Sequence, residues 1–198
     1  MLTTPYPSTA HIHDFAGQDA QHDQALRLVD AAFATYGYTS YATSVETFPP
    51  QVREALYRRL DRTARRVVHN PDRQYVAANQ LSVDVEVKSE GGRYPNFAID
   101  IDSHDAVLSC DGVYAFVDTG SGPILACWAK QVRVNTIWVP EQLPDFAAVM
   151  DRLRDEWPYA QPQPRQTRGG SQHPFILLPK DSPCLIDIEQ FIELGLGT

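Results

Sequence analysis

The chain has 198 residues, of which 43% are hydrophobic and 21% charged, and its formal net charge is −8. This size and composition fit a soluble globular domain with a full hydrophobic core, and the negative charge argues against a general nucleic-acid coat protein. No apolar run reaches the length of a membrane span, and residues 1–14 lack the pattern of a signal peptide. Three widely spaced cysteines predict reduced thiols in a cytoplasmic protein, without a disulfide framework.

The first part of the chain predicts an arm and a helix. Residues 1–18 have no clear periodicity and are expected to form an N-terminal arm. Apolar residues then recur at three- and four-residue steps over residues 19–36, which predicts a helix that ends at Gly37. Residues 37–48 are compatible with a loop or an edge strand. We expect residues 19–198 to form a single α/β domain.

An arginine-rich segment follows. Pro49-Pro50 opens a predicted helix that reaches Val68, with six arginines between residues 53 and 66. One interpretation is a basic strip that contacts phosphate through Arg58, Arg62 and Arg65. The other is a solvated helix face on which Glu54 and Asp61 neutralise the arginines.

The strongest strand pattern lies at residues 82–88. Val83, Val85 and Val87 alternate with Asp84, Glu86 and Lys88, so the valines face one side of the strand and the charged residues the other. Residues 73–77 predict a partner strand, and residues 77–80 the turn between them. Such a hairpin brings Asp72 back toward Glu86 and Lys88. Two carboxylates and an ammonium group in this arrangement indicate a site for a metal ion and a water molecule, or an ordinary solvent-facing strand.

Pro71-Asp72, followed at this distance by Glu86-Val87-Lys88, resembles the motif of the PD-(D/E)XK nuclease superfamily. The resemblance covers about residues 50–130 and implies a restriction-endonuclease-like core, with a mixed central β-sheet flanked by helices (α/β, or α+β). It implies that Asp72 and Glu86 hold Mg²⁺ or Mn²⁺ and that Lys88 acts on the attacking water and the phosphate of DNA. Asp84 is an additional metal-ligand candidate. Glu54 matches an acid that some family members carry on the preceding helix.

The rest of the chain predicts further strands and helices. Strands are expected at residues 96–102, 112–118, 123–129, 136–139 and 175–178, and helices at residues 144–157 and 187–194. Asp100, on the first of these strands, is a further acid that could face the site. Residues 158–174 are rich in proline, glycine and arginine and predict a flexible loop, in which Arg165 and Arg168 could close on a polyanion.

The sequence therefore predicts a metal-dependent nuclease that hydrolyses DNA. The alternative is a non-catalytic acidic interaction protein, such as an inhibitor, an immunity-type partner or a degenerate nuclease-fold binding protein. An acid-rich surface around Asp100, Asp102 and Asp105 would suit that role. The two hypotheses differ in whether Asp72, Glu86 and Lys88 converge on one point.

Overall fold

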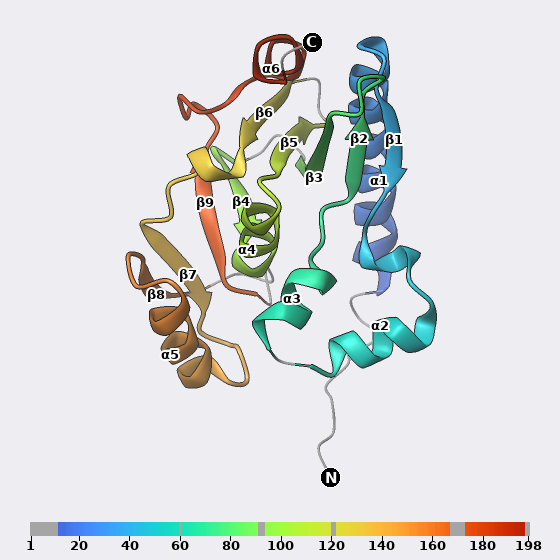
Figure 1. Cartoon of the computed structure of the whole chain (residues 1–198). Coiled ribbons are helices and arrows are strands. Elements are labelled where there is room, and N and C mark those ends of the chain that lie inside the picture. Colours follow the sequence, from blue (N-terminus) through green and yellow to red (C-terminus); the bar gives the residue numbers. More distant parts are fainter. Residues whose placement is uncertain (1–11, 60, 91–93, 120–121, 167–172, 197–198) are drawn as a thin grey trace.

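The computed structural model describes residues 12–59, 61–90, 94–119, 122–166 and 173–196. Its helices, shown in Figure 1, are α1 (Ile12–Thr35), α2 (Pro50–Tyr57), α3 (Arg62–Val68), α4 (Ile101–Ser109), α5 (Phe146–Glu156) and α6 (Ile188–Gly195). Its strands are β1 (Thr39–Ala42), β2 (Arg73–Val76), β3 (Ser82–Glu90), β4 (Asn96–Asp100), β5 (Val113–Asp118), β6 (Ile124–Trp128), β7 (Thr136–Pro140), β8 (Gln161–Arg165), β9 (Phe175–Pro179) and β10 (Ile186–Asp187). None of the described helices is long and apolar enough to cross a lipid bilayer.

The strands form two mixed sheets, where the sequence predicted one. The larger sheet has the order β1-β2-β3-β5-β6-β10, and the smaller has the order β4-β9-β7-β8. In the larger sheet β3 is antiparallel to β2 and parallel to β5. Both edges of β3 are therefore occupied, so β4 has no free edge beside it and pairs with β9. The fold is α+β, with helices flanking both sheets.

The predicted hairpin of residues 73–77 and 82–88 is confirmed. β2 and β3 pair antiparallel from Arg73↔Val85 to Val76↔Ser82. Val83, Val85 and Val87 are all buried, as the alternation predicted. They pack with α1, which lies along one face of the larger sheet (Figure 1).

A second hydrophobic core fills the space between the two sheets. The strand β5 contributes to both cores, since Val113, Ala115 and Val117 face α1 while Tyr114 and Phe116 face the smaller sheet. The helices α4 and α5 complete this second core. Because Glu86 pairs with Tyr114 in the parallel register, its side chain lies on the side of β3 that faces the second core.

Three segment boundaries differ from the prediction, and one of them is the strand expected at residues 96–102, which ends at Asp100 because α4 begins at Ile101. The first helix begins at Ile12, not at residue 19, so residues 12–18 belong to α1 and the rest of the predicted arm lies outside the described residues. The arginine-rich segment forms two helices, α2 and α3. The break has a local cause, because the carboxylate of Asp61 caps α3 by accepting a hydrogen bond from the backbone N–H of Ala64.

Part of the predicted flexible loop is a strand. Residues 161–165 form β8, which pairs parallel with β7, while residues 167–172 lie outside the described part of the chain. Gln161 N donates to Asn135 O, so the odd-numbered residues of β8 turn their backbone groups toward β7. Pro162 and Pro164 fall between them, where the missing N–H costs no ladder bond. Proline is tolerated on an edge strand for this reason.

Candidate functional site

The site begins where β2 ends and β3 continues. Arg73↔Val85 is the last pair of that ladder, so the next N–H groups of β3 on this side have no strand partner in β2. The Asp72 side chain is the hydrogen-bond partner of one of these groups, because its Oδ2 accepts a hydrogen bond of 2.9 Å from the backbone N–H of Val87. The backbone carbonyl of Asp72 is also held, by Thr43 N at 3.2 Å. The Asp72 carboxylate is therefore fixed against β3 at the level of Glu86 and Lys88.

Glu86 and Lys88 form a close ion pair on the same face of β3. Lys88 Nζ lies 2.6 Å from Glu86 Oε1, and the Glu86 side chain is only 9% exposed. Burial raises the pKa of Glu86 to about 7; the charge of Lys88 opposes this shift, and the charge of Asp72 adds to it. Burial lowers the pKa of Lys88, but attraction to Glu86, together with Asp72 and Asp100, outweighs burial and raises it. A charged lysine thus adjoins a carboxyl group that titrates near neutral pH.

The structure adds His22, a site residue that the sequence analysis missed. Its Nε2 lies 3.6 Å from Asp72 Oδ1. Hydrogen bonding to Asp72 raises the pKa of His22, burial lowers it, and the net change is upward. The position of His22 in the sequence could have indicated this contact. His22 precedes the buried residues Ala25 and Val29 at helical spacing. It therefore lies at the start of the apolar face through which α1 packs on β3.

A second group of possible metal ligands lies near Lys88. Ligand atoms of His69, Asp100 and Asp102 lie within 4.8 Å of one another. Asp100 Oδ1 caps α4 by accepting from the N–H groups of Asp102 and Ser103. Burial lowers the pKa of His69, which favours the neutral imidazole that binds metals. The charge of Asp100 also acts on Lys88, so this predicted extra acid does adjoin the site.

Asp84 and Glu54 have other partners. Asp84 Oδ1 accepts from Gln74 Nε2 at 3.2 Å, and burial raises the pKa of Asp84. Glu54 is largely exposed and pairs with Arg58, which follows the last residue of α2. The structure therefore groups Asp72, Glu86 and Lys88, and gives Asp84 and Glu54 contacts outside that group.

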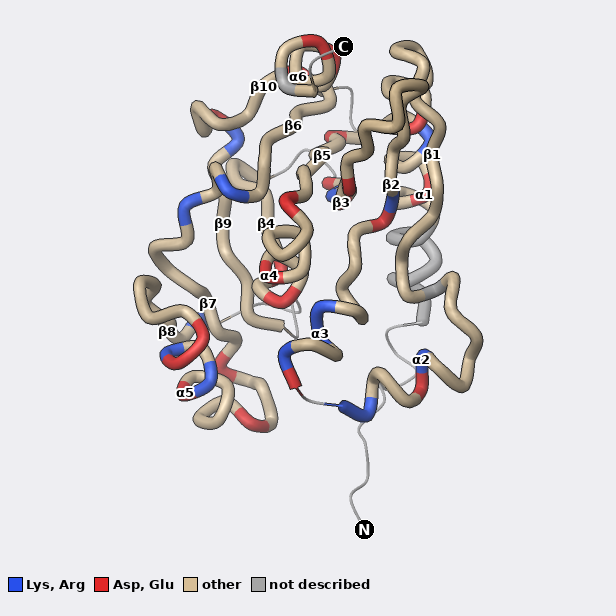
Figure 2. The backbone as a smooth tube through the Cα atoms, viewed as in Figure 1, with Lys and Arg blue, Asp and Glu red and all other residues tan. Residues whose placement is uncertain are grey.

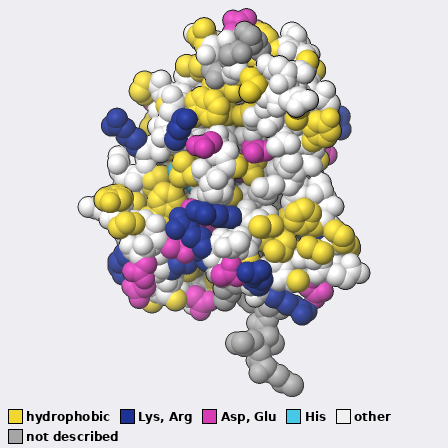
Figure 3. Space-filling view, viewed as in Figure 1, with side chains coloured by type: hydrophobic (Ala, Val, Ile, Leu, Met, Phe, Trp, Pro, Cys, Tyr) yellow, Lys and Arg dark blue, Asp and Glu magenta, His cyan; other side chains and the backbone are white. Residues whose placement is uncertain are grey.

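The arginines of α3 are engaged with acids of α4 and α5. Both Arg62 and Arg66 make two hydrogen bonds to the carboxylate of Asp105. Arg65 pairs with Asp102 and Glu156. Figure 2 shows the basic positions of α3 opposite the acidic positions of α4, and Figure 3 shows blue and magenta side chains intermixed in this region. The exposed face of α3 therefore does not form the continuous basic strip that the first interpretation required.

Arg165 and His104 both lie against aromatic rings. Arg165 lies over the rings of Trp138 and Phe175, with its guanidinium carbon 4.8 Å from the Trp138 centroid. Arg168 lies outside the described residues. His104 is completely buried, with its Nδ1 3.1 Å from the Tyr114 hydroxyl. β4 ends at Asp100, and α4 then turns His104 into the second core.

No protein-family model matches the chain, and comparisons with curated proteins and with solved structures found no significant match.

Proposed function

We propose that this protein is a metal-dependent nuclease of the PD-(D/E)XK type that hydrolyses DNA. The observation that carries the proposal is the convergence of Asp72, Glu86 and Lys88 beside β3. The hydrogen bond from Val87 N to Asp72, and the 2.6 Å contact between Glu86 and Lys88, fix these three side chains around one short stretch of strand. This grouping of two carboxylates and a lysine supports the proposal.

The donor set fits a divalent cation. Oxygen atoms of Asp72 and Glu86 are the kind of ligand that Mg²⁺ and Mn²⁺ prefer. The negative charge of Asp72 contributes to the raised pKa of Glu86, so the two carboxylates repel each other electrostatically. A cation held between them would remove that repulsion. His22 Nε2 lies near Asp72 Oδ1, so that His22 in its neutral form would add a nitrogen ligand, which favours Mn²⁺ over Mg²⁺.

The bound ion would polarise the scissile phosphate and acidify a coordinated water. The protein's own residues prepare this chemistry. Lys88 keeps its proton because the charges of Glu86, Asp72 and Asp100 act on it, and its ammonium group would orient the attacking water and offset charge on the phosphate. Asp72 is positioned for its role by the backbone of β3, which keeps one carboxylate oxygen in place.

The acidic interaction protein is less well supported. That hypothesis needed an exposed acidic surface around Asp100, Asp102 and Asp105. Asp105 is 7% exposed and is held by two arginines, and Asp102 pairs with Arg152. These charges are directed to partners within the chain, so the net charge of −8 is not concentrated there as a free docking surface.

The experiment that tests the proposal is cleavage of plasmid DNA, linear DNA and RNA in the presence of Mg²⁺ or Mn²⁺. We expect DNA cleavage that requires the metal and is lost almost entirely in Lys88→Ala. Lys180→Ala is the matched control, because Lys180 has nearly the same exposure, 23% against 24%, and also pairs with acids, Glu90 and Asp118. Cleavage that survives in Lys88→Ala, or that is lost to the same extent in Lys180→Ala, would overturn the assignment.

A further inference from the structure

The smaller sheet is open between β7 and β9. These strands are joined at one register pair, Trp138↔Phe175. On their other sides, by contrast, β9 forms a full ladder with β4 and β7 a full ladder with β8. Continuing the antiparallel register would next pair Thr136 with Leu177, but this pair does not form. The two strands therefore diverge on the side of the Trp138–Phe175 pair where Thr136 and Leu177 lie.

The backbone of Leu177 faces this opening. Ile101 N donates to Pro174 O, and Lys180 N donates to Pro95 O, at the two ends of the ladder between β4 and β9. These bonds fix which residues of β9 exchange hydrogen bonds with β4, because bonded and non-bonded pairs alternate along an antiparallel ladder. Leu177 falls at a non-bonded position. Its N–H and C=O are therefore directed away from β4 and toward β7.

The backbone of Thr136 faces the opening from the other side. Gln161 N donates to Asn135 O, and Glu141 N donates to Arg165 O, which fixes the parallel ladder between β7 and β8. In that ladder the odd-numbered residues of β7 exchange bonds with β8. Thr136 is even-numbered, so its N–H and C=O point toward β9. Two strand edges thus face each other without pairing.

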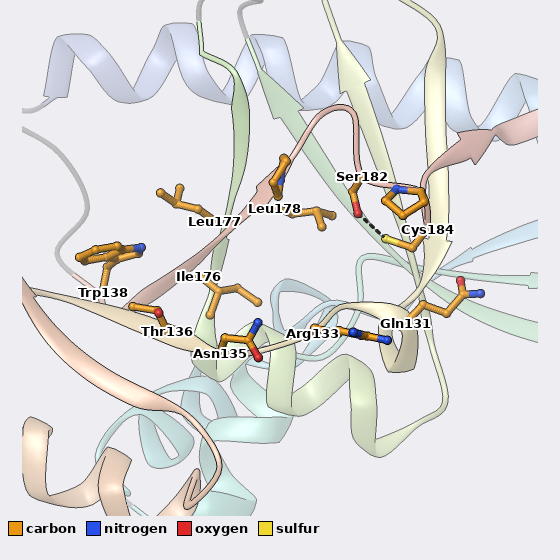
Figure 4. A pocket seen from close by; sticks show the side chains of 12 residues that line it. Gln131, Arg133, Asn135, Thr136, Trp138, Ile176, Leu177, Leu178, Ser182 and Cys184 are labelled. Carbon is orange, nitrogen blue, oxygen red and sulfur yellow. Dashed lines mark hydrogen bonds between the residues drawn. The ribbon is translucent and has the colours of Figure 1, made fainter.

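The space between these edges is a cavity of about 810 Å³ (Figure 4). This volume lies in the range of pockets that hold ligands, which is roughly 300–1,000 Å³. Leu177, Trp138 and Pro183 contribute apolar walls, while Gln131, Arg133 and Asn135 contribute polar groups at one end.

The cavity has a positive character in a negatively charged protein. Among the described residues that line it, none is acidic and Arg133 is the charged one. The Arg133 side chain is exposed. An acidic ligand group would therefore meet a cation here, without a competing carboxylate in the cavity wall.

We propose that this opening binds an extended segment of another polypeptide, which enters as a strand between β7 and β9. A peptide backbone alternates donors and acceptors, so it can bond to the N–H and C=O groups of both Thr136 and Leu177. A nucleic-acid backbone offers phosphate oxygens, which accept but do not donate. Apolar side chains of the segment would contact Leu177 and Pro183, and an acidic side chain or a C-terminal carboxylate would contact Arg133. This inference is independent of the proposed nuclease activity.

The test is selection of peptides from a random heptapeptide phage library on the full-length protein. We expect enriched peptides that contain an acidic residue next to apolar residues. Their affinity should fall at least tenfold in Arg133→Glu. Arg154→Glu is the control, since Arg154 is another exposed arginine but lies on α5 and pairs with Asp151. It should bind the peptides as the wild type does.

Amide hydrogen exchange locates the bound peptide. We expect the N–H groups of Thr136 and Leu177 to exchange more slowly when a selected synthetic peptide is present. The proposal is overturned if no peptide is enriched, if Arg133→Glu binds as tightly as the wild type, or if protection appears elsewhere. Slowed exchange of these two amides by a (dT)₁₀ oligonucleotide, with no effect of peptide, would also overturn it. Glu86→Gln should leave peptide binding unchanged, so this test stands apart from the nuclease proposal.

Discussion

The buried carboxyl group of Glu86 makes the stability of the protein depend on pH. Its pKa is raised from 4.5 to about 7, so the folded state binds more protons than the unfolded state between these values. Stability must therefore fall as pH rises through this window, by up to about 3 kcal/mol for a shift of this size. Glu86→Gln cannot ionise and should not show this loss.

We expect the stability of Glu86→Gln, measured by urea unfolding in EDTA, to rise relative to the wild type between pH 5 and pH 8. The relative gain should be about 2–3 kcal/mol. Glu54→Gln, which alters an exposed pair on α2, should change little across the same range. A constant difference between Glu86→Gln and wild type would show that Glu86 titrates normally.

His104 should have the opposite effect on stability, which should fall as pH decreases. Burial lowers the pKa of His104 from 6.5 to about 4, and Nε2 has no hydrogen-bond partner among the described residues. The neutral imidazole is favoured in the folded state, so its contribution is complete above pH 6.5 and is lost as pH falls toward 4. His104→Gln should lose less stability than wild type over this window, by up to about 3 kcal/mol in unfolding experiments. Parallel pH curves for the two proteins would contradict this account.

At the scale of elements, one carboxylate fastens α3 to α4. Asp105 accepts two hydrogen bonds from each of Arg62 and Arg66, and these pairs lower its pKa to about 2, although burial opposes the shift. Removing the carboxylate leaves two guanidinium groups without their partner. Asp105→Ala should therefore lower the free energy of unfolding by about 2–4 kcal/mol at pH 7.

The comparison for this prediction is Asp151→Ala, which removes an exposed i,i+3 pair with Arg154 on α5. That change should alter stability by less than about 0.5 kcal/mol. The free energies of unfolding of Asp105→Ala and Asp151→Ala can be compared by thermal or urea unfolding. Equal losses would mean that the α3–α4 ion pairs add no more than a solvated surface pair.

The elements that sequence predicted well are those with strong local patterns. Alternating valines specified β3 because burial of one strand face requires them. The arginine-rich segment shows the limit, since its apolar stripe continued through a helix break that one side chain, Asp61, determines. β8 was missed because its two prolines suggested a loop, although their backbone nitrogens fall on the free side of an edge strand.

At the scale of the whole molecule, the site divides into a local and a non-local part. Asp72, Glu86 and Lys88 belong to one hairpin, so their grouping followed from strand pairing and could be predicted from the sequence. His22 reaches Asp72 from α1, and Asp100 reaches the neighbourhood of Lys88 from the smaller sheet. Those contacts depend on how helices and sheets pack, which no local pattern encodes. The division of strands into two sheets was missed for the same reason.

The central claim is that Asp72 and Glu86 together hold a divalent cation. The most direct test is calorimetric titration of Mn²⁺ into the metal-free protein at pH 8, where Glu86 is ionised. The account predicts saturable binding to the wild type that is lost in Glu86→Gln and in Asp72→Asn, while Lys88→Ala and Glu54→Gln retain it. Absence of titratable binding in the wild type, or unchanged binding in both Glu86→Gln and Asp72→Asn, would contradict it.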